Sequence, residues 1–387
     1  MRIVHFADVH LGYRAYSKVT DSGINQREAD VFKTFEAALD AISPLEPDLV
    51  LMAGDLFHTV RPSNLVIHHT FRRLHGFLAE AKCPLVMIAG NHESPRSSDT
   101  GCILRLYSNI PGVVVEDSRC VGLRIPNTEV TVFCVPHRGL GYLESALLEP
   151  DPKSRYNILM LHGTLDGIPP SVYDTYTVPR SALRAHQWDY IALGHYHKFE
   201  QVESNGYYPG SLEYTSPNFW EELGTAKGFI EYNLAEHRLV RFHKVQSPRS
   251  FVSLGRIDAQ GLSAKEVDQL IADALAKAKG GIADKVIRLV VENIPRDVQR
   301  ELDHKAIREA RTTALHFDLV FIQPGKVRPS AVVHSPDGTM RRTLETEWEE
   351  FADGYESPPA VQKPRLKQLG LDYLAKADDG LSAVPDG

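Results

Sequence analysis

A short apolar segment that ends in Gly-Asn-His-Glu constrains the fold of this chain more than any other stretch. Residues 85–89 are all apolar, and Gly90, Asn91, His92 and Glu93 follow them directly. An apolar run of this length closed by a glycine predicts a short buried strand. Ligands of open α/β sheets bind beyond the carboxyl ends of the strands, so the amide, imidazole and carboxylate groups at this point indicate a binding site.

Polar side chains also follow four other apolar segments, at the points where strands are expected to end. They are Asp8 and His10 after residues 1–6, Asp55 after residues 48–53, His162 after residues 158–161, and His195 and His197 after residues 190–193. Each motif alone has a simpler explanation. A Gly-Asp pair is common in turns, because both residues favour turns, and a single histidine is more often an ordinary buried residue. A series of such motifs, each at a strand end, is hard to explain by coincidence. We therefore interpret these residues, together with Asn91, as one site.

The ligand types in this set are those that a pair of divalent cations needs. Two metal ions roughly 3.5–4 Å apart, sharing one carboxylate, clamp the attacking and leaving oxygens of a phosphoryl displacement. Carboxylate and amide oxygens mixed with imidazole nitrogens suit manganese, iron or zinc better than calcium. The ligand types do not choose among those three metals. The sequence thus predicts a two-metal hydrolytic site.

Apolar periodicity between the candidate ligands predicts a parallel α/β arrangement. Residues 31–42 repeat at helical spacing, and Ser63 can cap a second helix that runs to Ala81. The apolar stripe expected on this second helix comprises Ile67, Phe71, Leu74 and Leu78. The order strand, helix, strand, helix, strand predicts parallel pairing of the three strands.

The rest of the chain predicts a second sheet, a smaller α/β unit and a tail. Short strands at residues 113–115, 121–125 and 130–135 indicate an antiparallel second sheet. A capping box at Ser263 and Glu266 begins a helix of the smaller unit. The expected divisions are residues 1–245 for the core, 246–330 for the small α/β unit and 331–387 for a linker and helical tail.

Bulk composition is that of an ordinary soluble protein. Apolar residues make up 43% and charged residues 24% of the 387 positions, and the net charge of −7 gives no sign of a basic nucleic-acid coat. No apolar run approaches membrane-spanning length, and the N-terminal residues do not resemble a signal peptide. The cysteines, which show no CxxC spacing, are Cys83, Cys102, Cys120 and Cys134. We expect reduced, mostly buried thiols in a cytoplasmic protein without a membrane partner.

The ordered motifs D-x-H, G-D, G-N-H-[ED], H and G-H-x-H resemble those of the calcineurin-like metallophosphoesterases. By that resemblance, Asp8, His10, Asp55 and His197 hold one metal, and Asp55, Asn91, His162 and His195 hold the second. The resemblance makes Asp55 the bridging ligand and leaves His92 uncoordinated. His92 is then placed to donate a proton to the leaving oxygen or to stabilise the phosphorane, and either role fits general acid catalysis.

The second motif separates two branches of this superfamily. It continues as Leu56-Phe57-His58, whereas phosphoprotein phosphatases continue with aspartate-arginine-glycine. Over residues 1–245 the chain resembles the SbcD nuclease family, including the stretches 5–14, 25–35, 208–213 and 227–228. The resemblance implies a two-sheet α/β sandwich flanked by helices, a small α/β capping domain that binds DNA, and a helical C-terminal tail. It also implies that His58 orients the catalytic histidine or the phosphate, and that Glu93 replaces a more usual aspartate.

The function implied by this resemblance is that of a manganese-dependent DNA nuclease in double-strand-break repair. Its expected activities are 3'–5' exonuclease action on duplex ends and endonuclease action on single strands, with two manganese ions as cofactors. Its expected partners are DNA, an SbcC-type SMC-like ATPase and a second copy of the chain. Two rivals remain open: a phosphodiesterase for small nucleotides, and a non-enzymatic DNA-end tether that has lost its metals.

Two surface regions carry expectations about partners. Tyr13 and Arg14 follow the first ligands and either contact DNA or form a plain loop. The residues expected to form a self-complementary patch for a homodimer are Val66, Phe77, Leu104 and Tyr107.

The tail carries a further expectation about a partner. Its apolar stripes are Leu344, Trp348 and Phe351, then Leu366, Leu369 and Tyr373. Helices this short are marginal alone, so the tail either folds back on its own core or lies in a groove of another protein. The resemblance names the ATPase as that protein.

Overall fold

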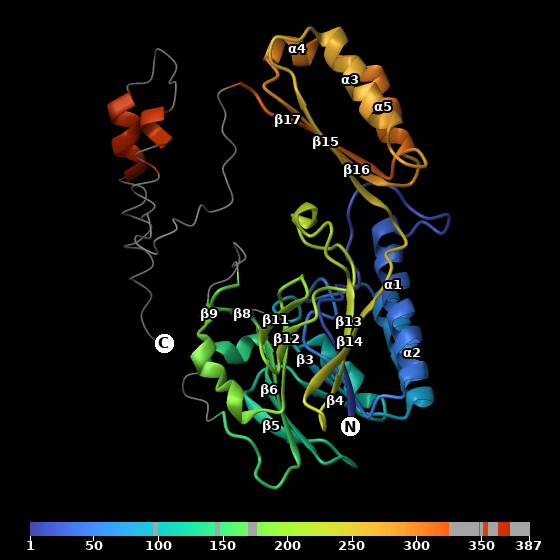
Figure 1. Cartoon of the computed structure of the whole chain (residues 1–387), viewed down its shortest axis with the longest axis vertical. Helices are drawn as coiled ribbons and strands as arrows, with labels where there is room; N and C mark the ends of the chain where they lie inside the picture. The colour runs from blue at the N-terminus through green and yellow to red at the C-terminus, as the bar shows by residue number, and fades with distance from the viewer. Residues whose placement is uncertain are drawn as a thin grey trace. The chain divides into compact units, whose positions relative to one another are not determined.

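The computed structural model describes residues 1–95, 100–143, 148–168, 176–324, 348, 351–354 and 363–371. The chain divides into two compact units, Met1–Pro324 and Gly325–Gly387 (Figure 1). The first unit contains two sheets with flanking helices and a smaller three-stranded sheet. The expected α/β class with two multi-stranded sheets is confirmed.

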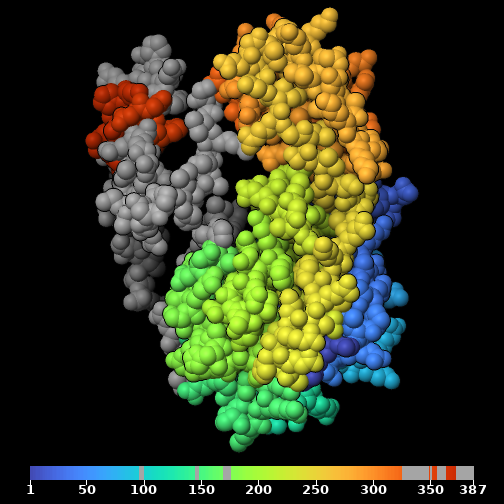
Figure 2. Space-filling view, viewed as in Figure 1, coloured from blue at the N-terminus to red at the C-terminus, as the bar shows by residue number. Residues whose placement is uncertain are grey.

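The first sheet joins the N-terminal strands with strands from much later in the chain. Its order is β14 (Arg238–Lys244), β13 (Gly228–Asn233), β1 (Arg2–Phe6), β2 (Leu49–Met52), β3 (Leu85–Ile88) and β4 (Val113–Glu116). Strands β1 to β4 pair in parallel, as the alternating strand and helix pattern predicts, while β13 is antiparallel to β1. β14 is an edge strand with mostly exposed or half-buried side chains, and its residues lie on the visible surface in Figure 2 (yellow).

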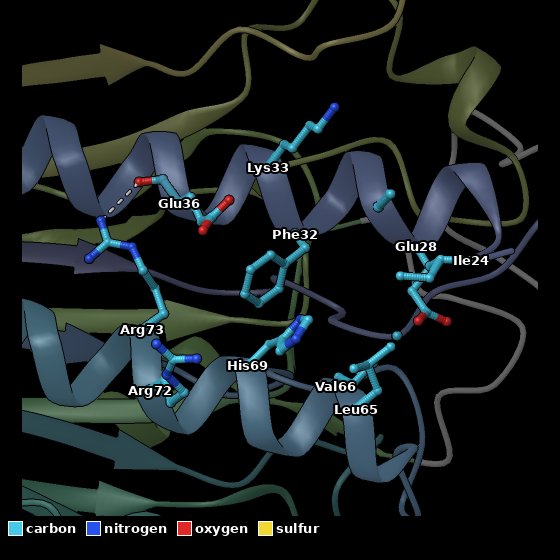
Figure 3. A pocket seen from close by; sticks show the side chains of 12 residues that line it. Ile24, Glu28, Phe32, Lys33, Glu36, Leu65, Val66, His69, Arg72 and Arg73 are labelled. Atoms are coloured by element: carbon cyan, nitrogen blue, oxygen red, sulfur yellow. Dashed lines mark hydrogen bonds between the residues drawn. The ribbon is translucent and has the colours of Figure 1, made fainter. Parts of the chain in front are cut away.

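Two long helices pack against this sheet. They are α1 (Gln26–Ile42), capped by the side chain of Asn25, and α2 (Asn64–Ala81), capped by Ser63. Figure 3 shows the groove between them, where the Phe32 ring lies 5.7 Å from that of His69 and Arg73 donates to the carbonyl oxygen of Glu36. The two helices therefore contact each other as well as the sheet.

The face that α2 buries differs from the expected one. Val66 and Phe77, expected on a free surface, are 6% and 1% exposed and belong to the core, while Ile67 and Phe71 are only half-buried. Leu104 and Tyr107, at 0% exposed, are also core residues. The patch proposed for a homodimer is therefore wrong in its named residues. Thr70 explains the error, because this polar residue faces the core and its hydroxyl bonds internally to the Val66 carbonyl oxygen.

The second sheet is mixed, which corrects the expected antiparallel pairing. Its order is β11 (Glu200–Glu203), β12 (Gly206–Tyr208), β10 (Tyr190–Gly194), β7 (Tyr156–His162), β6 (Val130–Val135) and β5 (Val121–Arg124). Only the two outer pairs, β5 with β6 and β11 with β12, are antiparallel, and β4 belongs to the first sheet. β7 is buried along its whole length on both faces, which is typical of parallel strands.

The remaining elements of the first unit are short or belong to the smaller sheet. β8 (Thr164–Leu165) pairs with β9 (Thr177–Val178), and short 3-10 helices cover Ser43–Leu45, Ile103–Asn109, His137–Tyr142, Arg180–Leu183, Ala185–Gln187 and Phe219–Glu221. The parallel three-stranded sheet consists of β15 (Phe251–Asp258), β16 (Val286–Glu292) and β17 (His316–Phe321). It has its own apolar core with α3 (Ala264–Ala276), α4 (Arg296–Arg300) and α5 (His304–Thr313), and the capping box of Ser263 and Glu266 is present.

In the second unit the described residues form two helical pieces that contact each other. Residues 351–354 and 363–371 are helical, and the indole of Trp348 donates to the carbonyl oxygen of Lys367 at 2.9 Å. Phe351 and Leu369 are 59% and 46% exposed, so the pieces keep apolar side chains open to solvent. Leu344 and Tyr373 lie outside the described residues.

The cysteines and the helices bear on the expectations of reduced thiols and of no membrane-spanning segment. All four cysteines are free thiols, and Cys83, Cys102 and Cys134 are buried. Burial raises the pKa of the Cys83 thiol to about 11, so this group stays protonated at neutral pH. Among the described helices, none has both the length and the apolar character needed to cross a membrane.

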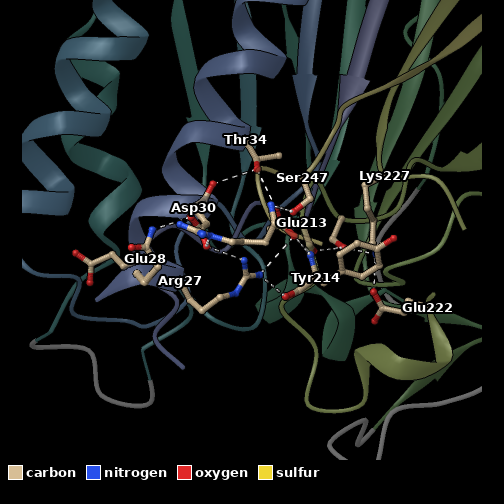
Figure 4. A network of polar contacts seen from close by, with 12 residues as sticks. Arg27, Glu28, Asp30, Thr34, Glu213, Tyr214, Glu222, Lys227 and Ser247 are labelled. Atoms are coloured by element: carbon tan, nitrogen blue, oxygen red, sulfur yellow. Dashed lines mark hydrogen bonds and ion pairs between the residues drawn. The ribbon is translucent and has the colours of Figure 1, made fainter. Parts of the chain in front are cut away.

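A buried network of charges joins α1 to the loop after β12 and to the connection that leads to β15 (Figure 4). The Arg27 guanidinium ion lies 3.3 Å from Asp30 and 3.4 Å from Glu213, and it donates to the Tyr214 carbonyl oxygen at 3.0 Å. Arg249, just before β15, donates to Asp30 at 2.8 Å. Because Arg27, Asp30 and Glu213 are at most 1% exposed, each charge depends on its partners for stabilisation.

We expect Arg27→Met to lower the free energy of unfolding by about 3–5 kcal/mol, because it leaves the buried Glu213 carboxylate without a cation and the buried Asp30 carboxylate with Arg249 alone. Arg238→Met is the matched control, since Arg238 and its ion-pair partner Glu236 are both exposed, and surface ion pairs contribute little. Urea unfolding followed by circular dichroism measures both variants. Equal midpoints for the two variants would contradict the role given to Arg27.

Candidate metal centre

The carboxyl ends of strands from both large sheets meet at one place. Asp8 follows β1, Asp55 follows β2 and Asn91 follows β3 in the first sheet, while His162 ends β7 and His195 follows β10 in the second. Parallel neighbours present their carboxyl ends at the same edge, so residues far apart in the sequence become neighbours in space. The structure brings all the candidate ligands together, in two groups.

The first group consists of Asp8, His10 and His197. One side-chain atom of each residue lies within 4.8 Å of the others, and the Nε2 atoms of His10 and His197 are 3.0 Å apart. Burial holds the pKa of both imidazoles below the usual value, the more so for His10. Two neutral imidazoles that direct ring nitrogens at each other, beside a buried carboxylate, are arranged as metal ligands are.

The second group consists of Asp55, His162, His195 and Asn91. Atoms of the first three lie within 4.8 Å of one another. The Oδ1 atom of Asn91 is 3.1 Å from His162 Nε2 and 3.0 Å from His195 Nδ1. The other ring nitrogen of His162 lies 2.7 Å from the Ala53 carbonyl oxygen, which can only accept a hydrogen bond. His162 Nδ1 therefore carries a proton, and Nε2 is the ring nitrogen that faces Asn91 and Asp55 within the group.

Asp55 lies between the two groups. Its Oδ2 atom is 3.8 Å from His10 Nε2 in the first group and 3.4 Å from His162 Nε2 in the second. Burial lowers the pKa of His162, but the Asp55 carboxylate, together with Asp8 and the Ala53 carbonyl group, outweighs burial and raises that pKa to about 9. The site thus stabilises positive charge beside Asp55, and its oxygen and nitrogen donors are those of divalent transition metals. These residues fit a pair of such cations.

Several of these residues have an unusual backbone conformation. Asp8, His10, Asp55 and His195 have φ values of 53°, 55°, 55° and 103°, in the region that side chains other than glycine rarely adopt. Such strain collects at functional sites and persists only where the surrounding structure enforces it. Two neighbouring positions require glycine for steric reasons. A Cβ atom at Gly90 would lie 2.0 Å from Asp55 Oδ1, and one at Gly194 would lie 1.9 Å from the Ala53 carbonyl oxygen.

Glu93 holds two of the strand ends together. Its carboxylate accepts hydrogen bonds from the backbone N–H groups of Gly90 at 2.9 Å, Asp55 at 3.1 Å and Phe57 at 2.6 Å. Burial raises the pKa of Glu93 to about 8, with a further contribution from Asp55. Glutamate therefore performs a structural task here, joining the Gly-Asp turn to the Gly-Asn-His turn.

His92 and His58 stand beside the first group. His92 Nδ1 lies 2.7 Å from the His58 carbonyl oxygen, and the His92 backbone N–H donates to Asp55 Oδ1 at 2.9 Å. The two imidazole rings stack with centroids 5.1 Å apart, and His58 Nδ1 is 3.4 Å from His10 Nδ1. Burial lowers the pKa of His58 to about 4. His10, His58 and His92 also form a cluster that is close enough to hold a metal.

The two residues expected to contact DNA lie in different settings. The Tyr13 ring contacts His58 edge-on at 5.0 Å between centroids, which places Tyr13 beside the histidine cluster. Arg14 is exposed, but its guanidinium group is paired with Glu28. The structure therefore brings Tyr13 to the site and pairs Arg14 with a glutamate of α1.

Sequence reasoning missed a buried ion pair beside the first group. The Lys227 ammonium group bonds to Glu222 and also donates to the His197 carbonyl oxygen at 2.8 Å. Burial raises the pKa of Glu222, but Lys227 and His197 outweigh burial, so that pKa is lower than usual. Lys227 lies in a stretch that resembles the SbcD family, whereas no local pattern marks Glu222.

Comparisons with known proteins agree with this geometry. The family model "Calcineurin-like phosphoesterase" matches residues 1–199. Relatives named "DNA double-strand break repair protein Mre11" include one from Methanocaldococcus jannaschii, 31% identical over 59% of this chain and 61% of the relative. Another from Methanopyrus kandleri is 29% identical over 64% of this chain and 57% of the relative. A third from Archaeoglobus fulgidus is 30% identical over 55% of this chain and 50% of the relative.

These matches differ in how much of each protein they cover. The chain spans between half and about three fifths of the length of these relatives. The family model, in contrast, covers more than half of this chain and includes every residue of both ligand groups. The chain belongs to the calcineurin-like phosphoesterase family.

Proposed function

We propose that the chain is a two-metal DNA nuclease of the SbcD and Mre11 type that acts in double-strand-break repair. The observation that carries the proposal is the convergence of two ligand groups on Asp55, with His92 directly beside them. A site with one bridging carboxylate and separate ligands on either side suits phosphodiester hydrolysis. The activities in this proposal are 3'–5' exonuclease action on duplex ends and endonuclease action on single strands.

The ligands in this proposal follow the two groups. Asp8, His10 and His197 hold one ion, Asn91, His162 and His195 hold the other, and Asp55 contacts both. Manganese is the proposed metal, and when bound the pair supplies Lewis-acid stabilisation and an activated water at neutral pH.

His92 is the proposed proton donor to the leaving oxygen. Its Nδ1 atom donates to the His58 carbonyl oxygen, which fixes the ring orientation and directs Nε2 away from that bond. His58 thus positions His92 through its backbone carbonyl group as well as through ring stacking. Tyr13, whose ring contacts His58, is the proposed contact for a DNA base or sugar beside the metal centre.

DNA as the substrate is supported by the relatives and by the added parts of the chain. The relatives are named as DNA double-strand break repair proteins. A hydrolase for small nucleotides does not need the three-stranded sheet with its own core or the further residues beyond Pro324. The proposed division is a nuclease core of residues 1–245, a DNA-binding cap of 246–330 and a tail of 331–387 that binds an SbcC-type ATPase.

The test compares substrates under one set of conditions. The purified chain is incubated with manganese and, in parallel, with single-stranded DNA, 3'-labelled duplex DNA and a cyclic nucleotide, with a chelator as the control. The proposal expects manganese-dependent cleavage of both DNA substrates and little turnover of the cyclic nucleotide. The reverse preference would support the alternative, a phosphodiesterase for small nucleotides, and no cleavage of any substrate would support a DNA-end tether.

A homodimer is also part of the proposal, through a surface different from the expected patch. Leu65 of α2 and Leu106 of the 3-10 helix Ile103–Asn109 are 42% and 40% exposed. The two elements lie against each other, because the Tyr107 hydroxyl donates to the Ile67 carbonyl oxygen at 3.1 Å. Exposed leucines on adjacent elements are suited to a self-complementary contact.

A chain that ends at Pro324 is expected to cleave single-stranded DNA as the full chain does, because every proposed ligand lies in the first unit. The same truncation should abolish binding of the ATPase, since the apolar side chains of Trp348, Phe351 and Leu369 are removed. Nuclease assays and pull-downs with the ATPase measure the two effects. Full-strength binding by the truncated chain would place the ATPase contact elsewhere.

A further inference from the structure

Residues 216–222 connect the three-stranded sheet with the candidate metal centre. Phe219, which is 6% exposed, clusters with Val286 of β16 and with Leu315 just before β17. The Arg288 guanidinium group of β16 lies 5.5 Å from the centre of the Trp220 ring. The middle of this segment is therefore held by the three-stranded sheet.

Glu222, at the C-terminal end of the segment, lies beside Lys227 (Figure 4). It contacts His197 both directly and through that lysine. Glu222 is 5% exposed, and one of its oxygens lies 3.7 Å from His197 Nδ1. The same carboxylate accepts hydrogen bonds from Ser216 and Lys227. Lys227 in turn donates to the His197 carbonyl oxygen and to Ser211, each at 2.8 Å. The ring and the backbone of His197 thus contact one buried ion pair.

The two ring nitrogens of His197 have different surroundings. Nε2 faces His10 Nε2 at 3.0 Å, inside the first ligand group. Nδ1 is buried and makes no hydrogen bond to any of the described residues. An imidazole that binds a metal through Nε2 carries its proton on Nδ1, and that N–H group needs an acceptor. The Glu222 carboxylate is placed to be this acceptor.

We infer that Glu222 is a positioning residue that orients the ligand His197 and makes metal affinity depend on the contact between residues 219–220 and the three-stranded sheet. This inference rests on the proposed role of His197 as a ligand. Carboxylates that accept from a ligating histidine fix its ring and raise its basicity, and their loss typically weakens metal binding by ~10–100-fold. The short helix Phe219–Glu221 leads directly into Glu222, so a shift at the sheet contact moves the carboxylate.

The first test measures manganese binding to the full-length chain by electron paramagnetic resonance and calorimetry. Glu222→Gln is expected to weaken one of two manganese sites by ~10–100-fold. Glu221→Gln, one residue away and exposed, is the matched control and should bind as the wild type does. Glu222→Gln alone leaves the buried Lys227 charge without its carboxylate and should lower stability. The double variant Glu222→Gln, Lys227→Met removes both buried charges, so it should be more stable than Glu222→Gln and still bind manganese weakly.

The second test is a double-mutant cycle on the sheet contact. Trp220→Ala is expected to weaken manganese binding in the wild-type background and to have no further effect in Glu222→Gln. Arg288→Met, which alters the same contact from the other side, should behave in the same way.

The outcomes separate the inference from the proposed function. Wild-type affinity in Glu222→Gln would overturn the inference. No effect of Trp220→Ala in the wild-type background, or equal effects in both backgrounds, would overturn the coupling. A wild-type chain that binds fewer than two manganese ions would instead overturn the proposed function.

Discussion

Asp55→Asn is expected to reduce manganese-dependent DNA cleavage to the background level and to lower the manganese content of the chain. The Asp55 carboxylate lies between both ligand groups, 3.8 Å from His10 Nε2 and 3.4 Å from His162 Nε2. An amide has no negative charge and offers a single oxygen, so it cannot neutralise and bridge two cations.

The fold should survive this change. Asparagine tolerates the φ of 55° at this position, and its oxygen can still accept the hydrogen bond from the His92 backbone. The bond from the Asp55 backbone N–H to Glu93 does not involve the side chain. Asp48→Asn, the same substitution at an exposed position just before β2, is the control and should keep both metal and activity. An Asp55→Asn variant with two manganese ions and normal cleavage would contradict the bridging role.

His92→Gln is expected to keep both manganese ions and bind DNA, yet to cleave ~10²–10⁴-fold more slowly, the usual contribution of a positioned proton donor. The glutamine amide can still donate to the His58 carbonyl oxygen but cannot release a proton to the leaving oxygen. Metal content must be measured together with the cleavage rate, because His92 lies in a cluster with His10 and His58 that is itself close enough to hold a metal. Metal content by plasma mass spectrometry and single-turnover cleavage separate the two roles.

A fall in manganese content that parallels the fall in rate would make His92 a ligand and not a proton donor. His69→Gln is the matched control, because His69 is an exposed histidine on α2, away from the ligand groups. It should change neither metal content nor rate. Normal cleavage by His92→Gln would remove His92 from the catalytic machinery altogether.

The candidate site could be predicted because the end of a strand can be recognised in the local sequence, and the ends of parallel strands meet at one edge of the sheet. Asp8, Asp55 and Asn91 each follow an apolar run, and parallel pairing brings such positions to one edge. His162 and His195 follow the same rule in the second sheet. The glycines in these motifs also have a local cause, since Gly90 and Gly194 stand where a Cβ atom would clash.

Other features depend on contacts between distant segments, which periodicity does not reveal. β4 joins the first sheet beside β3, and β6 pairs in parallel with β7, although both strands have the short, turn-bounded pattern of an antiparallel sheet. On α2 two apolar faces compete, and the internal hydrogen bond of Thr70 allows the less apolar one to be buried. Glu222 acts through His197, from which it is separated by β11, β12 and the 3-10 helix Phe219–Glu221, so no local motif indicates it.

The most direct test of the central claim is a crystal of the full chain grown with manganese and measured at the manganese absorption edge. We expect two anomalous peaks roughly 3.5–4 Å apart. One should lie against Asp8, His10 and His197, the other against Asn91, His162 and His195, with Asp55 contacting both. A single peak within the cluster of His10, His58 and His92, or no peak at Asp55, would contradict the account.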